Sequence, residues 1–176
     1  MISVISGIYR QRKLATPGEG THPMGERERN ALFNMIADNI QGALVADLYA
    51  GSGALGIEAL SRGAEKCVFV EKNPAAMKVI RNNCLTLGIP EEKFSFYLGS
   101  VQSFCKKVDP ERYTIVLADP PYDNFKEADF TAISDLIKAE GILVLSHPEE
   151  ALVLPGLTLE KTKKYAGAHI SIYNKE

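Results

Sequence analysis

The sequence predicts an α/β fold built on a mainly parallel sheet. Three observations lead to this expectation. Strand and helix patterns alternate from residue 43 onward, a glycine-rich loop follows the first strand of that series, and the last two strand patterns have no helix between them. Alternation of this kind is typical of parallel sheets covered by helices. The last two strands should pair as a hairpin, which makes one strand antiparallel.

The first part of the chain differs in pattern from the rest. Residues 2–7 and 11–15 are able to pair as a β-hairpin, and residues 16–23 indicate a loop because proline and glycine are frequent there. We therefore expect an N-terminal hairpin extension with its loop at residues 1–24 and a main domain at residues 25–176.

The main domain should begin with a helix and continue as alternating elements. Apolar residues at spacings of three and four predict the first helix at residues 26–40. Pro74 in the first turn of a later helix and Gly88 just past its end are typical helix boundaries. Strands are expected at 43–49, 66–71, 94–98, 113–118, 142–146, 157–164 and 168–174, and further helices at 54–62, 74–87, 101–107 and 125–138.

Composition limits the classes of protein that the chain could represent. No run of 18 apolar residues occurs, and the apolar stretch at the N-terminus is too short for a signal peptide, so we expect a cytoplasmic protein without a membrane span. The formal net charge of −2 speaks against a dedicated nucleic-acid binder. Local basic clusters can still bind phosphates, although they can equally be solvated surface. They comprise Arg10, Arg12 and Lys13, then Arg27 and Arg29, and finally Lys161, Lys163 and Lys164.

Cysteine and histidine residues indicate no metal site. Cys67, Cys84 and Cys105 form no C-x-x-C pair, and an odd number of cysteines is unlike a disulfide framework, so three reduced thiols are expected. His22 and His147 are isolated in the sequence, and we expect both to be surface or turn residues.

The glycine-rich loop indicates a binding site for a nucleotide-like ligand. Gly51, Gly53 and Gly56 fit the pattern G-x-G-x-x-G between a strand and a helix. Without a Cβ atom, the backbone can turn sharply and lie against a ligand. The pattern alone does not separate a dinucleotide from S-adenosylmethionine, and a tight turn before a packed helix is the simpler alternative.

Two acidic residues favour S-adenosylmethionine. Glu71 ends the strand after the glycine loop, where a carboxylate can accept hydrogen bonds from both ribose hydroxyls of an adenosine. Asp47 stands at the start of the loop. A carboxylate there would balance the ammonium group of S-adenosylmethionine, whereas it would repel the pyrophosphate of a dinucleotide.

The tetrad Asp119-Pro120-Pro121-Tyr122 follows a strand and indicates chemistry on an amino group. The prolines make the turn rigid and leave its carbonyl groups directed outward. The Asp119 carboxylate and the Pro120 carbonyl can accept the two N–H groups of a base amine, and Tyr122 can stack on the extruded base. Catalysis would come from orientation and from negative charge beside the developing positive nitrogen, with no metal.

Together these motifs resemble the RsmD-type enzymes, bacterial methyltransferases of guanine N2 in 16S ribosomal RNA. The resemblance covers nearly the whole chain. It is carried by the run DLYAGSGALGIEALSRG at residues 47–63, by residues 28–34, by Val70-Glu71, by Asn83, by the Asp-Pro-Pro-Tyr tetrad, and by the terminal Tyr165-Ala166-Gly167 with Ile172-Tyr173. The 47–63 run is fairly specific, whereas other amino methyltransferases share the tetrad.

The resemblance implies a Rossmann-like methyltransferase fold with a seven-stranded sheet. It implies S-adenosylmethionine as cofactor, S-adenosylhomocysteine as product, and a target guanine of the position-966 type in 16S rRNA, within the small subunit or an assembly intermediate. We further expect a monomer. The candidate cofactor-binding residues are Asp47, Tyr49, Gly51, Gly53, Glu71, Lys72, Ser100, Val101 and Asp119; the candidate catalytic residues are Asp119, Pro120 and Tyr122; and the candidate RNA-binding residues are Arg10, Arg12, Lys13 and Arg27.

The sequence departs from the family pattern at three places. His22-Pro23-Met24 stands where the family usually has Arg-Pro-Thr, and His147 stands where an acidic residue is often found. Ser100 replaces the Asp that commonly contacts the adenine amino group, and a hydroxyl is a weaker acceptor than a carboxylate.

Three other functions remain open from the residues. A nicotinamide-dependent oxidoreductase would explain the glycine loop and Glu71 but would give the proline tetrad no role. A non-catalytic RNA-binding or assembly factor could keep the fold without using Asp119. A methyltransferase acting on DNA adenine or on a protein amide could use the same tetrad.

Overall fold

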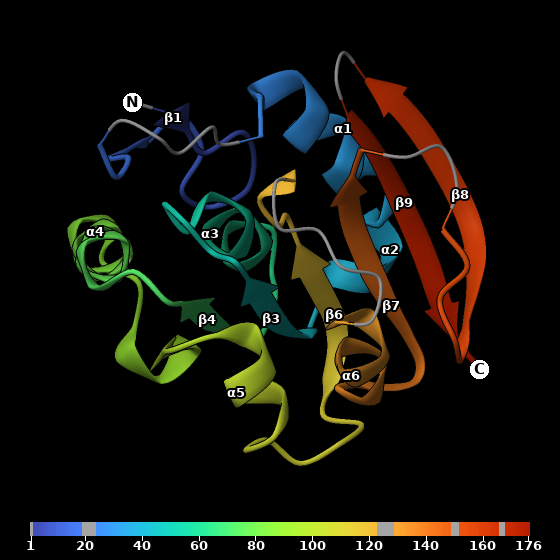
Figure 1. The fold of residues 1–176 in the computed structure, drawn as a ribbon. Helices are drawn as coiled ribbons and strands as arrows, with labels where there is room; N and C mark the ends of the chain where they lie inside the picture. The colour runs from blue at the N-terminus through green and yellow to red at the C-terminus, as the bar shows by residue number, and fades with distance from the viewer. Residues whose placement is uncertain (1, 19–23, 123–128, 149–151, 166–167) are drawn as a thin grey trace.

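The computed structural model describes residues 2–18, 24–122, 129–148, 152–165 and 168–176 (Figure 1). Its strands are β1 (Ile2–Ser3), β2 (Lys13–Leu14), β3 (Leu44–Leu48), β4 (Lys66–Glu71), β5 (Phe94–Leu98), β6 (Tyr113–Ala118), β7 (Ile137–His147), β8 (Leu157–Tyr165) and β9 (Ala168–Lys175). Its helices are α1 (Glu26–Met35), α2 (Ala37–Ile40), α3 (Ala54–Ser61), α4 (Pro74–Leu87), α5 (Val101–Cys105) and α6 (Asp129–Asp135), with a 3₁₀ turn at Glu91–Lys93.

Seven strands form one sheet in the order β5-β4-β3-β6-β7-β9-β8. The first five of these are parallel, and β9 runs antiparallel to both β7 and β8. The Rossmann-like fold and its C-terminal antiparallel hairpin are therefore confirmed. β1 and β2 form a separate antiparallel pair, which confirms the N-terminal hairpin, although each strand has only two residues.

Helices cover both faces of the sheet. Apolar side chains of α1, α2, α3 and α4 pack on one face, and those of α5 and α6 pack on the other. Val4 and Leu14, from the N-terminal extension, are 2% and 1% exposed and belong to the same core cluster as α1 and α3. The extension is thus docked on the face that carries α3 and α4.

Some expected helices are interrupted or end earlier than the pattern indicates. The first helix breaks at Ile36, whose φ of −109° and ψ of 14° are not helical, and the chain resumes as α2. Ile36 and Ile40 are both buried, so the break keeps each of them in the core. The helix expected at 101–107 ends at Cys105.

The expected helix at 125–138 is wrong at its C-terminal end. α6 stops at Asp135, and β7 begins at Ile137, which pairs with Tyr113 of β6. The register between β6 and β7 is irregular between Tyr113 and Ile115, and Glu140 has a φ of +61°. β7 is therefore longer than the expected 142–146 segment because an irregular stretch precedes its regular part. Residues 125–128 of the expected helix lie outside the described residues.

The expectation that His147 is a surface residue is also wrong. His147 is 0% exposed, and its Nε2 lies 2.7 Å from the Ser171 hydroxyl. Its ring stacks on His169, its partner across β7 and β9, at 5.8 Å between centroids. His147 ends an inner strand that lies between β6 and β9 in the sheet, where Ser171 and His169 of β9 contact its ring. His22 lies outside the described residues.

Candidate active site

Strands β3, β4 and β6 end beside one another. Leu48, the last residue of β3, pairs with Val70 of β4 on one side and with Ala118 of β6 on the other. Because these strands are parallel, the turns that follow them share the carboxyl edge of the sheet (Figure 1). The glycine loop (residues 49–53) and the proline turn (residues 119–122) therefore lie side by side, where α/β sheets bind ligands.

The glycine loop has the backbone that its residues predict. Gly51 and Gly53 have φ of +57° and +78°, and Tyr49 also adopts a positive φ of +59°. The Ala50 N–H donates to the Val70 carbonyl at 3.0 Å, and the Gly53 N–H donates to the Ala50 carbonyl at 2.7 Å. A Cβ on Gly53 would lie 3.0 Å from the Ile80 side chain of α4. Glycine is thus required here for conformation and for close packing.

Glu71 connects β4 to this loop. One carboxylate oxygen accepts the Gly51 N–H at 2.9 Å, and the other accepts the Asn73 N–H at 2.8 Å. The side chain is half-buried, whereas the neighbouring Lys72 is exposed. Each carboxylate oxygen can accept a second hydrogen bond, so Glu71 keeps capacity for a ligand hydroxyl.

Asp47 is a buried carboxylate beneath the loop. It is 1% exposed, and its Oδ2 accepts the Gly56 N–H of α3 at 2.9 Å. Burial raises the pKa of Asp47 well above its usual range, the Gly56 N–H lowers it in part, and the negative charges of Asp119 and Glu71 raise it further. The charges of Asp119 and Glu71 thus act on the buried Asp47 carboxyl, which favours a cationic ligand group there.

The proline turn is held by a residue that sequence reasoning missed. The Tyr122 hydroxyl lies 2.6 Å from the Ser146 hydroxyl, at the end of β7. Burial raises the pKa of Asp119, while a hydrogen bond with the Ser146 side chain lowers it in part. Ser146 thus bridges the Asp119 carboxyl and the Tyr122 phenol. Pro120 is buried, Pro121 is exposed, and Asp119 and Tyr122 are half-buried.

No local sequence signal identifies Ser146. It is near the proline turn because Ala118 of β6 pairs with Leu145 of β7, more than twenty residues away in the chain. Only the order of strands in the sheet reveals that contact. Burial also raises the pKa of the Tyr122 phenol, so this hydroxyl stays protonated over a wide pH range and can donate to Ser146.

Ser100 and Val101 lie at the start of α5, past the end of β5. The Ser100 hydroxyl caps the helix by accepting the Ser103 N–H at 3.1 Å. Val101 is 4% exposed and packs in the core on the α5 and α6 face. Ser100 is exposed at the same sheet edge as Glu71, because Leu98 of β5 pairs with Glu71.

The four candidate RNA-binding residues are all exposed but lie on different parts of the molecule. Arg10, Arg12 and Lys13 belong to the N-terminal extension. Arg12 donates to the Thr86 carbonyl of α4 at 3.0 Å, which uses part of its guanidinium. Arg27 lies on α1, and its charge acts on Tyr165 of β8. The structure therefore brings three of these cations together and separates the fourth from them.

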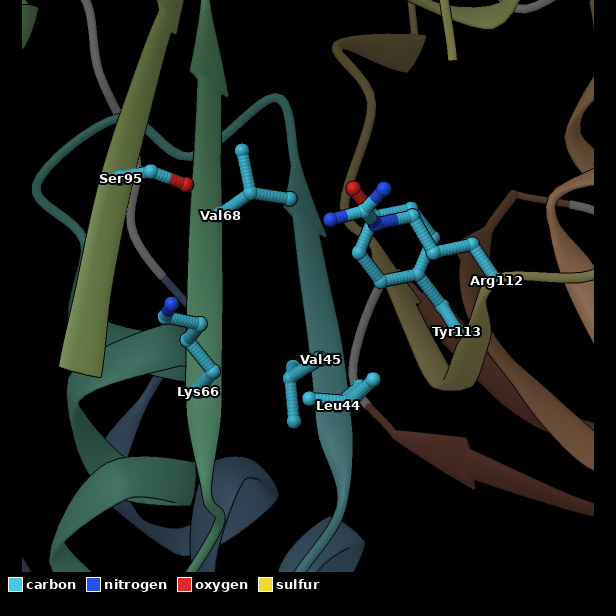
Figure 2. A pocket seen from close by; sticks show the side chains of 7 residues that line it. All are labelled: Leu44, Val45, Lys66, Val68, Ser95, Arg112 and Tyr113. Carbon is cyan, nitrogen blue, oxygen red and sulfur yellow. The ribbon is translucent and has the colours of Figure 1, made fainter. Parts of the chain in front are cut away.

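A hollow of about 50 Å³ lies away from this edge (Figure 2). It opens where β3, β4 and β6 begin, so it faces the opposite end of the sheet from the glycine loop and the proline turn. Its lining residues are Leu44, Val45, Lys66, Val68, Ser95, Arg112 and Tyr113.

Within the described residues, no three His, Cys, Asp or Glu side chains are grouped to hold a metal ion. None of the described helices has the length and apolar character needed to cross a membrane.

Comparisons with known proteins identify the family of this chain. The family model described as "Conserved hypothetical protein 95" matches residues 2–174. The Bacillus subtilis protein YlbH is 32% identical, over 98% of this chain and 98% of its own length. The Haemophilus influenzae protein named "Ribosomal RNA small subunit methyltransferase D" is 34% identical, over 69% of this chain and 64% of its own length.

Solved structures show that the similarity to these relatives covers the whole fold. The Escherichia coli protein yhhF superposes with a TM-score of 0.89 at 29% identity, covering 99% of this chain and 98% of that one. A protein from Thermus thermophilus gives a TM-score of 0.83 at 29% identity, covering 98% of both chains. This chain therefore belongs to the family described as "Conserved hypothetical protein 95" and is an RsmD-type methyltransferase.

Proposed function

We propose that this methyltransferase transfers a methyl group from S-adenosylmethionine to the exocyclic N2 amine of a guanine in 16S rRNA, of the position-966 type, in the small subunit or an assembly intermediate. The observation that carries the proposal is the position of the proline turn beside the glycine loop, at the shared end of β3 and β6. Relatives named as small-subunit rRNA methyltransferases support the choice of RNA as substrate.

The residues at the sheet edge fit S-adenosylmethionine. The glycine loop allows close approach, and Glu71 keeps acceptor capacity for the ribose hydroxyls. The buried Asp47 carboxyl would gain a counter-charge from the cofactor's ammonium group. Because the charges of Glu71 and Asp119 reach Asp47 at this edge, the pyrophosphate of a dinucleotide would be repelled there. Tyr49, Lys72, Ser100 and Val101 complete the proposed cofactor-binding set.

The proline turn fits an amino group as nucleophile. When bound, the cofactor supplies an electrophilic methyl group, and the chain must orient the attacking nitrogen. The Asp119 carboxylate and the Pro120 carbonyl would accept the two N–H groups of the amine, and Tyr122 would stack on the extruded base. Ser146 holds both Asp119 and Tyr122, so these groups are oriented before the substrate arrives. The Asp119 charge would stabilise the positive charge that develops on nitrogen.

Arg10, Arg12, Lys13 and Arg27 are the proposed contacts to rRNA phosphates. All four are exposed, and Arg12 keeps guanidinium donors that the Thr86 carbonyl does not use. Because the net charge is −2, such contacts must be local. Free RNA and subunit particles should be compared as substrates to find which form the enzyme uses.

Separate variants of Asp119 and Glu71 test the division of roles. We expect Asp119→Ala to abolish methyl transfer while binding of S-adenosylhomocysteine survives, because Asp119 acts on the amine. Glu71→Ala should first weaken cofactor binding, since it removes the ligand acceptor and the bond to the Gly51 N–H. The exposed Asp109 provides a matched control, Asp109→Ala, that should change neither property. Equal loss of cofactor affinity in the Asp119 and Glu71 variants would contradict the proposal.

Mass spectrometry of ribosomal RNA nucleosides tests the substrate. Cells that lack the gene should lose N2-methylguanosine from 16S rRNA, and the wild-type gene should restore it, whereas the Asp119→Ala gene should not. An unchanged N2-methylguanosine content would rule out the ribosomal substrate. Restoration by the Asp119→Ala gene would instead indicate a non-catalytic assembly factor. Tight NAD binding without S-adenosylhomocysteine binding would indicate an oxidoreductase.

A further inference from the structure

Asn83 joins two distant parts of the backbone. It lies on α4, is 5% exposed, and uses its whole carboxamide. The Asn83 Oδ1 accepts the Ala15 N–H at 2.9 Å, and its Nδ2 donates to the Ala15 carbonyl at 2.9 Å and to the Ser52 carbonyl at 3.0 Å. Ala15 follows β2 in the N-terminal extension, and Ser52 is in the glycine loop.

The same face of α4 supports the glycine loop at a second point. Ile80, one turn before Asn83, packs so close to Gly53 that a Cβ there would lie 3.0 Å from its methyl group. Ser52, between the two positive-φ glycines, is 5% exposed. Asn83 thus fixes the direction of the Ser52 carbonyl, and with it the peptide plane that joins Ser52 to Gly53.

The carboxamide is suited to this position in a way that other side chains are not. An asparagine side chain offers two N–H donors and one carbonyl acceptor, and the three bonds use both donors and the acceptor. An aliphatic side chain would leave three backbone groups without these partners, and an aspartate would lose both donors. A buried unpaired polar group is costly, so the residue type matches its contacts.

Other contacts anchor the N-terminal extension without touching the glycine loop. Glu58 of α3, 0% exposed, accepts the Ile5 N–H at 2.8 Å and the Ser6 N–H at 3.0 Å, and it pairs with Arg62 at 2.7 Å. Ser61 accepts the Tyr9 N–H at 3.0 Å. Asn83 differs from these anchors because one side chain holds both the extension and the loop.

We propose that Asn83 is a positioning residue that links cofactor binding to the order of the N-terminal extension. The inference rests on the proposed function, because it requires the glycine loop to bind the cofactor. A ligand that favours one position of the Ser52 carbonyl also favours the Asn83 contact to Ala15. By reciprocity, an ordered extension favours cofactor binding. The extension carries Arg10, Arg12 and Lys13. Cofactor binding should therefore also order these proposed RNA contacts.

Titration calorimetry with S-adenosylhomocysteine on the full chain tests the inference. We expect Asn83→Ala to weaken binding roughly tenfold, as for loss of a buried hydrogen-bond network. Asn83→Asp keeps the size and the acceptor but removes both donors, and it should weaken binding in the same direction if Asn83→Ala fails to fold. The control is Asn82→Ala, at the exposed neighbour of Asn83 on α4, and it should bind within about twofold of the wild type.

Hydrogen exchange at residues 12–16 gives a readout that a merely structural role would not move. S-adenosylhomocysteine should slow exchange there in the wild type and in Asn82→Ala, but not in the Asn83 variants. Unchanged cofactor affinity in both Asn83 variants, or equal weakening in Asn82→Ala, would overturn the inference while leaving the proposed function intact. Failure of the wild type to bind S-adenosylhomocysteine would overturn both.

Discussion

Asp119 combines partial burial with a carboxyl group that, in the proposed mechanism, must be charged to stabilise a developing cation. Burial raises its pKa, and the hydrogen bond from Ser146 opposes that rise by favouring the charged form. Ser146 therefore serves the proposed chemistry in two ways: it orients the carboxyl group, and it keeps the group ionised at lower pH.

The opposing effects of burial and of Ser146 on the pKa of Asp119 predict the pH dependence of the reaction. Methyl transfer should fall as pH drops through the pKa of Asp119, at a pH above the ordinary range for an aspartate. Ser146→Ala removes the interaction that lowers this pKa, so the acid limb of the kcat/KM profile should move to higher pH. The profiles of the two proteins should be measured over the same buffers. A limb that stays in place, or moves to lower pH, would show that Asp119 does not control it.

Asp47 has a proposed role in cofactor binding, and its burial has a cost in stability. Its folded-state pKa is well above the usual value because of burial. The folded state therefore holds the proton to higher pH than the unfolded state does, and the free energy of unfolding falls as pH rises from the ordinary aspartate range through the folded pKa. With an uncharged side chain of the same shape, the free energy of unfolding would not fall in this way as pH rises.

Asp47→Asn should therefore be more stable than the wild type without cofactor, and the difference should grow as pH rises. Asparagine can still accept the Gly56 N–H through its carbonyl oxygen. Thermal unfolding from acid to neutral pH measures the effect. Added S-adenosylhomocysteine should stabilise the wild type more than the variant, since the variant lacks the counter-charge for the ammonium group. A variant less stable than the wild type at neutral pH would contradict this account.

At the scale of elements, the packing of α3 against β4 depends on Gly56. A Cβ there would lie 2.4 Å from the Phe69 ring and 2.7 Å from the Cys67 sulfur, both on β4. Alanine in a helix is favoured over glycine by about 1 kcal/mol. Overpacking a core costs about 1–3 kcal/mol, and these contacts involve the ends of buried side chains in a strand.

Gly56→Ala should therefore lower the free energy of unfolding by up to about 2 kcal/mol in total, because overpacking outweighs the gain in helix propensity. It should also weaken cofactor binding, since the Gly56 N–H donates to Asp47. Gly18→Ala is the control, because nothing lies within 4 Å of a Cβ at Gly18. Denaturant unfolding of both variants measures the difference, and equal stability of the two would refute the packing argument.

Elements with their own boundary signals could be predicted from the sequence. The helix at 74–87 has Pro74 at its start and Gly88 with a φ of +69° after its end, and the structure confirms both limits. Boundaries that are set by tertiary contacts could not be predicted from the sequence. Ile36 breaks its helix while it stays buried, and Ile137 leaves a helical pattern to pair with Tyr113. Local patterns contain no information about either partner.

At the scale of the whole molecule, the candidate site follows from topology. Parallel strands bring their carboxyl ends together, so the loop after β3 and the turn after β6 could be expected to meet once the strands are neighbours. Ser146 and Asn83 could not be given a role from the sequence, because their contacts span 24 to 68 residues. The burial of His147 beside β9 has the same long-range origin.

The charge of the whole molecule would make the proposed RNA binding dependent on local cations. The formal net charge of −2 gives no general attraction to phosphate, so the exposed Arg10 and Lys13 should contribute contacts that salt weakens. Lys66 and Lys106 are also exposed, and Lys66 lies where β4 begins, at the opposite end of the sheet. The pair Arg10 and Lys13 and the pair Lys66 and Lys106 are therefore alike in exposure but differ in position.

Replacing Arg10 and Lys13 together by Glu should weaken binding to 16S rRNA and reduce its salt dependence. Two lost phosphate contacts should lower the slope of log K against log salt by about 1.4, at roughly 0.7 per contact for single-stranded RNA. The matched pair Lys66→Glu and Lys106→Glu changes the net charge equally and should leave the slope nearly unchanged. Binding should be measured by filter retention over a series of salt concentrations, with S-adenosylhomocysteine affinity as the check on folding. Equal slopes for the two pairs would mean that total charge, rather than the N-terminal extension, governs RNA binding.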